Sequence, residues 1–179
     1  MNPMELIHRY YADEPALEHI LTVHSRQVAQ RALQVAVSHP ELQLDTTFLY
    51  EAAMLHDIGI LRCDAPGIEC HGTEPYIRHG VEGADILRRE GLPRHARVAE
   101  RHTGTGLTRE MIVRQQLPLP PCDLVPETTE ERVICYADKF YSKSRLEVEK
   151  TPEQVMRSLA KFGDECAALF MQWHQIFSI

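Results

Sequence analysis

The sequence predicts an all-α fold in a single domain that extends over residues 1–179. Apolar residues recur at the spacing of amphipathic helices over most of the chain, and no segment of useful length alternates apolar and polar residues as a half-buried strand does. Prolines, glycines and capping residues divide this pattern into about six or seven helices. A chain of 179 residues is long enough to form one hydrophobic core without disulfides or a structural metal.

Two helices are expected in the N-terminal part of the chain. Asp13 is a candidate N-cap for the first, with Pro15 in its first turn, and Pro40 would end it. Asp45 is a candidate N-cap for the second, which would stop at Gly59, a residue type that often follows the C-terminus of a helix.

Loops and two shorter helices are expected in the middle of the chain. Residues 60–76 contain prolines and glycines and predict a loop. A third helix is expected over residues 79–91 and a fourth over 93–102, where glycines follow. Residues 117–127 contain four prolines and predict a surface loop.

Capping signatures open the two last expected helices. Thr128 and Glu131 match a capping box, and the helix that they open should run through Asp138 toward Glu149.

The signature at Thr151 repeats this pattern and opens the last helix, over residues 152–178. We expect that helix to pack on a core formed by residues 20–145. Its apolar end, residues 167–179, should cover the core, although contact with a partner such as a second copy of the chain is the alternative.

Composition excludes several functional classes. The net charge of −7 and a pI near 5.8 argue against a broad nucleic-acid surface, so no nucleic-acid partner is expected. No window approaches the ~20 apolar residues of a membrane helix, and the N-terminus has no apolar signal segment. The five cysteines follow no regular spacing and are expected to be reduced. These features predict a cytoplasmic protein that does not bind membranes.

Cys63, Cys70 and His71 could form a small zinc site. The spacing fits no common zinc finger, however, and no fourth ligand is evident. Ordinary thiols in a loop are the simpler interpretation.

Histidine is unusually common, since the chain has ten histidines and nine glycines. Four histidines and two aspartates lie within or at the ends of the expected helices and have apolar neighbours. They are His24, His56, Asp57, His79, His102 and Asp138. Burying such groups is costly unless they are paired or bind a metal. Imidazole and carboxylate ligands suit zinc, iron, manganese and similar ions, and the two oxygens of Asp57 could bridge two ions. We therefore expect these six side chains to converge on one centre.

The order of these residues resembles a known family. His24, the run Leu55-His56-Asp57-Ile58-Gly59 and a later Asp138 resemble the HD superfamily of metal-dependent phosphohydrolases, in its HDIG subset. Further segments resemble the other signatures of that family and of a small single-domain branch within it: residues 24–29, 79–84, 101–108, 124–128 and 135–139. The resemblance covers about residues 20–145 and implies a single HD domain.

The resemblance implies a dinuclear site. His24, His56, Asp57 and Asp138 would hold the first metal ion. Asp57, His79 and His102 would hold the second, with Asp57 as the bridge. The chain lacks the lysine soon after the HDIG run and the Gly-Tyr-Pro motif of cyclic-di-GMP phosphodiesterases, and Thr103 stands where a paired histidine would follow His102. These departures argue against cyclic-di-GMP as substrate and against a trinuclear site.

The implied activity is hydrolysis of a small phosphorylated metabolite, with a nucleotide as the expected substrate. Two divalent transition metal ions (iron, manganese, zinc, nickel or cobalt) would activate a hydroxide that Asp57 orients as the catalytic residue. Phosphomonoesterase, phosphodiesterase and pyrophosphatase activities stay open. The alternatives are a dinuclear iron oxygenase of the HD type and a non-catalytic module that senses a nucleotide. A homodimer is possible.

Four side chains are candidates for binding the substrate phosphate. They are Lys143, Arg78, Arg101 and His71. The first three lie near expected ligands, and His71 lies in the loop that could form a lid. Lys139 is expected to point elsewhere, because neighbouring helical residues diverge by about 100°.

Overall fold

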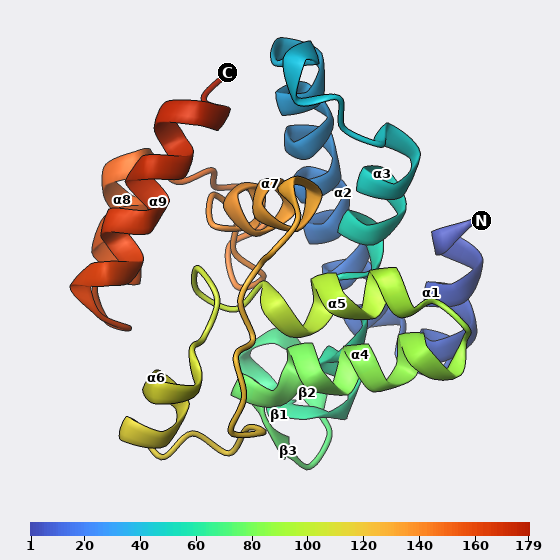
Figure 1. Cartoon of the computed structure of the whole chain (residues 1–179). Coiled ribbons are helices and arrows are strands. Elements are labelled where there is room, and N and C mark those ends of the chain that lie inside the picture. Colours follow the sequence, from blue (N-terminus) through green and yellow to red (C-terminus); the bar gives the residue numbers. More distant parts are fainter.

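The computed structural model describes residues 1–179 and confirms the all-α fold class (Figure 1). It contains nine α-helices rather than six or seven. They are α1 (Pro3–Tyr11), α2 (Pro15–Ser38), α3 (Thr46–Leu55), α4 (His79–Arg89), α5 (Pro93–Arg101), α6 (Arg109–Arg114), α7 (Thr129–Asp138), α8 (Pro152–Leu159) and α9 (Asp164–Phe177). The additional helices are α1, α6 and one formed by a break in the expected last helix. That break lies at Gly163, whose φ of +136° a helix cannot contain.

Side-chain caps set most of the expected helix starts. The Asp45 carboxylate accepts a hydrogen bond of 3.0 Å from the backbone N–H of Phe48, and complete capping boxes form at Thr128 and Thr151. Asp13 is not a cap, because Pro15 takes the first helical position and the cap position falls to Glu14, which makes no side-chain capping bond.

The segment expected to be a loop over residues 60–76 contains a small sheet. Its strands β1 (Cys63–Ala65), β2 (Cys70–His71) and β3 (Glu74–Pro75) have the order β2-β1-β3, antiparallel between β1 and β2 and parallel between β1 and β3. Two or three residues are too few to show strand alternation in a sequence. The helix before this segment also ends earlier than expected, at Leu55, and a 3₁₀ turn follows over Ile58–Arg62.

The expected extension of α7 toward Glu149 is wrong. After Asp138 the backbone N–H groups of Lys139, Phe140 and Tyr141 bond to the carbonyl three residues back, at 3.1–3.3 Å, which tightens the last turn and ends the helix. The chain then turns back, and the N–H of Lys150 bonds to the carbonyl of Phe140 at 2.8 Å. Residues 139–150 therefore form an ordered loop between α7 and α8 rather than a helix.

A single hydrophobic core extends from Leu6 in α1 to Phe177 in α9. Figure 1 shows α7 near the centre, α2 and α3 beside it, the α4–α5 pair below them, and α8 and α9 together on one flank. Within the C-terminal apolar run Phe170, Trp173 and Phe177 are buried, and Phe170 stacks on Tyr136 of α7 with ring centroids 5.4 Å apart. None of the helices combines the length and the apolar character that crossing a membrane requires.

Candidate metal centre

The end of α3 directs two consecutive side chains toward one point. His56 has helical backbone angles, whereas Asp57 lies at φ −105° and ψ 9°, in the bridge region between helix and strand. Because the chain leaves α-helical geometry between them, both side chains face the same centre, and both are completely buried. The hydroxyl of Tyr11 in α1 supports this turn by donating to the Ile58 carbonyl at 2.7 Å.

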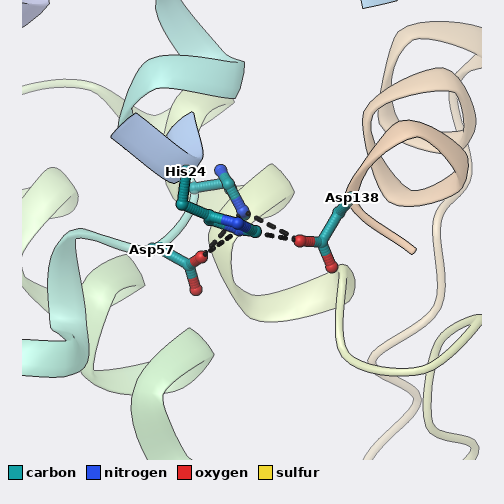
Figure 2. Close-up of side chains that lie close together, drawn as sticks. His24, Asp57 and Asp138 are labelled. Atoms are coloured by element: carbon teal, nitrogen blue, oxygen red, sulfur yellow. Dashed lines mark hydrogen bonds and ion pairs between the residues drawn. The ribbon is translucent and has the colours of Figure 1, made fainter. Parts of the chain in front are cut away.

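Four other elements bring the remaining candidates to the same place. His24 lies within α2, His79 is the first residue of α4, His102 directly follows α5, and Asp138 is the last residue of α7. All are buried. Figure 2 shows the His24 ring between Asp57 and Asp138, which reach it from opposite sides.

The two oxygens of Asp57 face different groups of residues. Its Oδ2 lies 3.1 Å from His24 Nε2 and 2.9 Å from His56 Nε2. Its Oδ1 lies 3.4 Å from His79 Nε2 and 3.3 Å from His102 Nε2. Asp57 is therefore placed between two sets of potential ligands.

The second carboxylate belongs to only one of these sets. Asp138 Oδ1 lies 3.0 Å from His24 Nε2 and 3.5 Å from His56 Nε2. The ligand atoms of His24, His56, Asp57 and Asp138 all lie within 4.8 Å of one another, and the same holds for Asp57, His79 and His102. This is the division into two groups that the family resemblance implies.

Backbone contacts fix the orientation of three histidine rings. The Nδ1 atoms of His56, His79 and His102 each donate to the carbonyl three residues earlier, at 2.6, 2.7 and 2.7 Å. In its neutral form, each ring would therefore direct an unprotonated Nε2 toward the centre. The Nε2 atoms of His79 and His102 are only 3.0 Å apart, a repulsive contact between lone pairs unless a cation lies between them.

Several buried polar atoms at the centre have no hydrogen-bond partner. Both oxygens of Asp57, Nε2 of His56 and Nδ1 of His24 are in this state. Apart from an ion pair of its Oδ2 with Lys143, Asp57 has only imidazole nitrogens near its oxygens, and these are not aligned for hydrogen bonding. Buried polar groups without hydrogen bonds are costly in a folded protein. Converging imidazole nitrogens and carboxylate oxygens of which several lack hydrogen bonds fit divalent transition metal ions.

The charged groups at the centre strongly shift one another's pKa values. Burial opposes ionisation, but His56 and Lys143 hold the pKa of Asp57 well below its usual range. Burial also opposes the charged form of His56, yet Asp57 raises the pKa of that ring to about 9. For His79 burial prevails and lowers the pKa to about 3, so this ring stays neutral, the form that binds metals.

Glycines allow the His56–Asp57 turn to contact α4 closely. A Cβ atom added to Gly59 would lie 2.2 Å from the carbonyl oxygen of His79 and 2.2 Å from the backbone nitrogen of Gly83. A Cβ at Gly80 would lie 2.5 Å from the Ala99 carbonyl oxygen in α5. Backbone thus packs directly on backbone, and this contact sets the distance between His56–Asp57 and His79.

A cavity of about 470 Å³ opens onto the centre, and we name it the metal cavity. His24, His79, His102 and Asp138 lie on its wall, together with Lys139, Lys143 and Tyr76. Ala65, Gly67 and Ile68 border it on one side, and α8 with Phe162 borders it on another. The expected candidate Lys143 forms an ion pair with Asp57 there.

The structure places the other three candidates for phosphate binding outside the metal cavity. Arg78 pairs with Glu74 at 2.8 Å and Glu82 at 2.7 Å. Arg101 pairs with Glu127 at 2.8 Å. The side chain of His71 is 58% exposed and lies near Glu69. The two arginines immediately precede His79 and His102, but the side chains of successive helical residues point in different directions. The ion pairs with nearby carboxylates then hold both arginines outside the cavity.

Cys63 and Cys70 are buried thiols in β1 and β2. Burial raises the pKa of Cys63 to about 12 and that of Cys70 to about 11, the range of ordinary buried thiols. Because His71 extends outward, no ligand cluster forms with the two thiols.

Sequence reasoning missed three residues of the metal cavity: Lys139, Tyr76 and Lys150. Lys139 is expected from helical geometry to point away from the centre, but α7 ends at Asp138. The Nζ atom of Lys139 therefore lies 2.6 Å from Asp138 Oδ2 and 2.9 Å from the His102 carbonyl oxygen. Tyr76 stacks on His79 with centroids 4.7 Å apart. A usable signal existed, because all four lysines of the chain fall within residues 139–161.

Several known proteins are similar to this chain. The family model of the HD domain matches residues 21–142. The chain is 35% identical over 150 residues to uncharacterized protein MJ0778 of Methanocaldococcus jannaschii, covering 83% of this chain and 79% of that protein. It is 34% identical over 167 residues to a tRNA (cytidine(56)-2'-O)-methyltransferase of Thermoplasma volcanium and over 136 residues to that of Picrophilus torridus. These matches cover 92% and 75% of this chain, but the chain spans only 42% and 34% of the two methyltransferases.

Two solved structures have a similar fold. Both are of the HD domain of the L. monocytogenes phosphodiesterase PgpH, one of them in complex with cyclic-di-AMP. The TM-score is 0.54 for each, at 17% and 16% identity. The match covers 91% of this chain and 85% of the first structure, and 98% of both chains for the second. The helical fold, the two groups of ligands that share Asp57 and the family match lead to one conclusion: the chain belongs to the HD domain family.

Proposed function

We propose that this protein is a metal-dependent phosphohydrolase that acts on a small phosphorylated metabolite, with a nucleotide as the expected substrate. One observation carries the proposal. Two ligand groups share the buried Asp57, and members of both line a cavity that also presents the side chains of Lys139 and Lys143. Such a site can hold two cations and still place positive charge beside a phosphoryl group.

The chain's own residues would divide the work. His24, His56, Asp57 and Asp138 would hold one metal ion, and Asp57, His79 and His102 a second. The bound ions would supply an activated water and neutralise charge on phosphoryl oxygens. Asp57 would position the attacking water as the catalytic residue. Lys139 and Lys143 would stabilise negative charge on the substrate, and Tyr76, which stacks on His79, would shield that ring from bulk water.

The test combines metal analysis with a substrate screen. Protein purified without chelator, and after supplementation with iron, manganese, zinc, nickel or cobalt, should contain close to two metal ions per chain. The same preparations should release phosphate from at least one phosphorylated metabolite, in air and without oxygen alike. Absence of stoichiometric metal would refute the site. Oxygen-dependent turnover without phosphate release would favour a dinuclear iron oxygenase, and nucleotide binding without turnover a sensor module.

Replacing His102 by Gln should reduce metal content from two ions to one. His102 belongs only to the group with Asp57 and His79, whereas the group that includes Asp138 keeps all its ligands. Elemental analysis of the purified variant measures the stoichiometry. His71→Gln is the matched control, because the exposed ring lies outside the metal cavity, and it should keep both ions. Equal metal content in the two variants would contradict the assignment of His102.

Replacing Lys143 by Gln should lower kcat/KM about 10²-fold while metal content stays at two ions. The ammonium lies on the wall of the metal cavity, where it would contact substrate phosphate with a charge-assisted hydrogen bond. Steady-state kinetics and elemental analysis on the same preparation separate the two effects. Arg109→Gln removes an exposed arginine that has no ion-pair partner and should change neither value. Unchanged kinetics for the Lys143 variant would exclude its role in phosphate binding.

A further inference from the structure

A second, strongly basic groove adjoins the metal cavity. It has a volume of about 270 Å³, and we name it the basic groove. Its lining consists of Ser142, Arg145, Val148, Lys150, Gln154, Arg157, Ser158 and Lys161. Half of these residues are cationic and none is a carboxylate, although the chain as a whole carries a net charge of −7.

The cations of the basic groove lack the partners that most other cations of this protein have. Ten arginines elsewhere in the chain form ion pairs with nearby carboxylates. Arg145, Lys150, Arg157 and Lys161 form none, and all but Lys150 are exposed. Four cations held together without an anion repel one another, so their arrangement favours binding of a negatively charged ligand.

The basic groove is continuous with the metal cavity. Ser142, Lys150 and Ser158 line both. Lys150 is half-buried at this junction, and burial together with the neighbouring Lys139 and Arg145 lowers its pKa. The Lys150 ammonium donates a hydrogen bond to the Lys139 carbonyl at 3.4 Å but has no ion-pair partner. An anion that extended from the cavity into the groove would relieve this repulsion and would supply that ion pair.

We infer that the substrate carries at least two phosphates, one at the metal cavity and a second in the basic groove, where Arg157 and Lys161 bind it. This inference rests on the proposed hydrolase function and narrows its substrate class to small nucleotides with more than one phosphate. The second phosphate belongs either to a polyphosphate chain or to a second nucleotide joined through a phosphodiester. Guanidinium and ammonium groups bind either form through charge-assisted hydrogen bonds.

The test compares three probes, namely AMP, ATP and the linear dinucleotide pApA, by titration calorimetry on metal-loaded protein. The wild type should bind ATP or pApA more tightly than AMP. Replacing Arg157 and Lys161 together by Gln should weaken the tighter ligand about tenfold or more and leave AMP unchanged. Tighter binding of ATP would indicate that the second phosphate belongs to a polyphosphate chain, and tighter binding of pApA that it belongs to a second nucleotide.

A charge-matched control separates specific binding from the general field of the protein. Arg109→Gln with Arg132→Gln removes two exposed, unpaired arginines that line neither the metal cavity nor the basic groove. Two results would overturn the inference. In the first, this control variant weakens the binding of ATP and pApA as much as replacing Arg157 and Lys161 does. In the second, the variant of Arg157 and Lys161 still binds ATP or pApA more tightly than AMP, to the same degree as the wild type.

Failure of the proposed function has a different signature. Phosphate release by the wild type is measured with the same three compounds and with the best compound of the metabolite screen. If the double variant of Arg157 and Lys161 no longer binds ATP or pApA more tightly than AMP, but the wild type releases phosphate from no compound, the role of the basic groove is supported and the hydrolase function is contradicted. If the wild type releases phosphate and the double variant keeps its tighter binding of ATP or pApA, only the role of the basic groove is contradicted. Metal content, measured in every variant, should stay at the wild-type value because no proposed ligand is altered.

Discussion

Replacing Asp57 by Asn is expected to empty both ligand groups of metal and to lower phosphate release by about 10³-fold or more, equivalent to several kcal/mol of transition-state stabilisation. Each oxygen of Asp57 faces a different group, so one substitution alters both. Asn keeps the shape of Asp but has one oxygen, an NH₂ group in place of the other, and no charge. Elemental analysis and kcat/KM on the same preparation measure the two effects.

Asp64→Asn is the matched control for this prediction. Asp64 lies in β1, is exposed and forms no ion pair, so this variant should keep two metal ions and full activity. The His102→Gln variant gives an internal comparison, since it should lose one ion where Asp57→Asn loses two. Retention of both ions and of activity in a folded Asp57→Asn protein would show that Asp57 does not bridge.

Replacing Gly59 by Ala is expected to destabilise the fold by about 3 kcal/mol, at the upper end of the cost of overpacking a core. The added methyl group would overlap the backbone of α4 at His79 and Gly83, and backbone cannot move aside as a flexible side chain can. For a chain of this size the melting temperature should fall by roughly 6–12 °C. Thermal unfolding followed by circular dichroism measures the shift.

Gly67→Ala provides the contrast. A Cβ at Gly67 would meet nothing within 4 Å, and its φ is not positive, so this substitution should leave the melting temperature within about 2 °C of the wild-type value. If the two variants melted at the same temperature, the close contact between the His56–Asp57 turn and α4 would not determine stability. The difference between them therefore measures what the glycine of the HDIG run contributes to the fold.

Helix periodicity and capping chemistry identified most of the fold because both act within a few residues. The capping boxes at Thr128 and Thr151 and the cap at Asp45 depend on side chains that bond to backbone one turn away. The helix α1 was missed although its signals are local: the Asn2 side chain accepts from the backbone N–H of Met4, and Pro3 opens the helix. The small sheet at β1–β3 was missed for a different reason, since its pairing joins segments too short to carry a pattern.

The six residues of the centre were identifiable because their order along the chain is distinctive and their burial in an apolar setting needs an explanation. Their convergence agrees with that expectation, since each lies on or next to a helix that packs on the common core. The surrounding cations were harder to place. Arg78 and Arg101 stand next to His79 and His102 in sequence, yet carboxylates hold them outside the cavity, whereas Lys139 lies in it.

The helical class, most helix starts and the set of histidines and aspartates that converge could therefore be predicted from the sequence, because periodicity, capping and motif order are local or depend only on the order of residues. Tertiary structure decided how the two oxygens of Asp57 divide between ligand groups, which cations face the cavity, and that a basic groove continues from it. Those features depend on distances between elements far apart in the chain. Direct backbone contact at Gly59 and the end of α7 at Asp138 set the distances, and no local pattern encodes them.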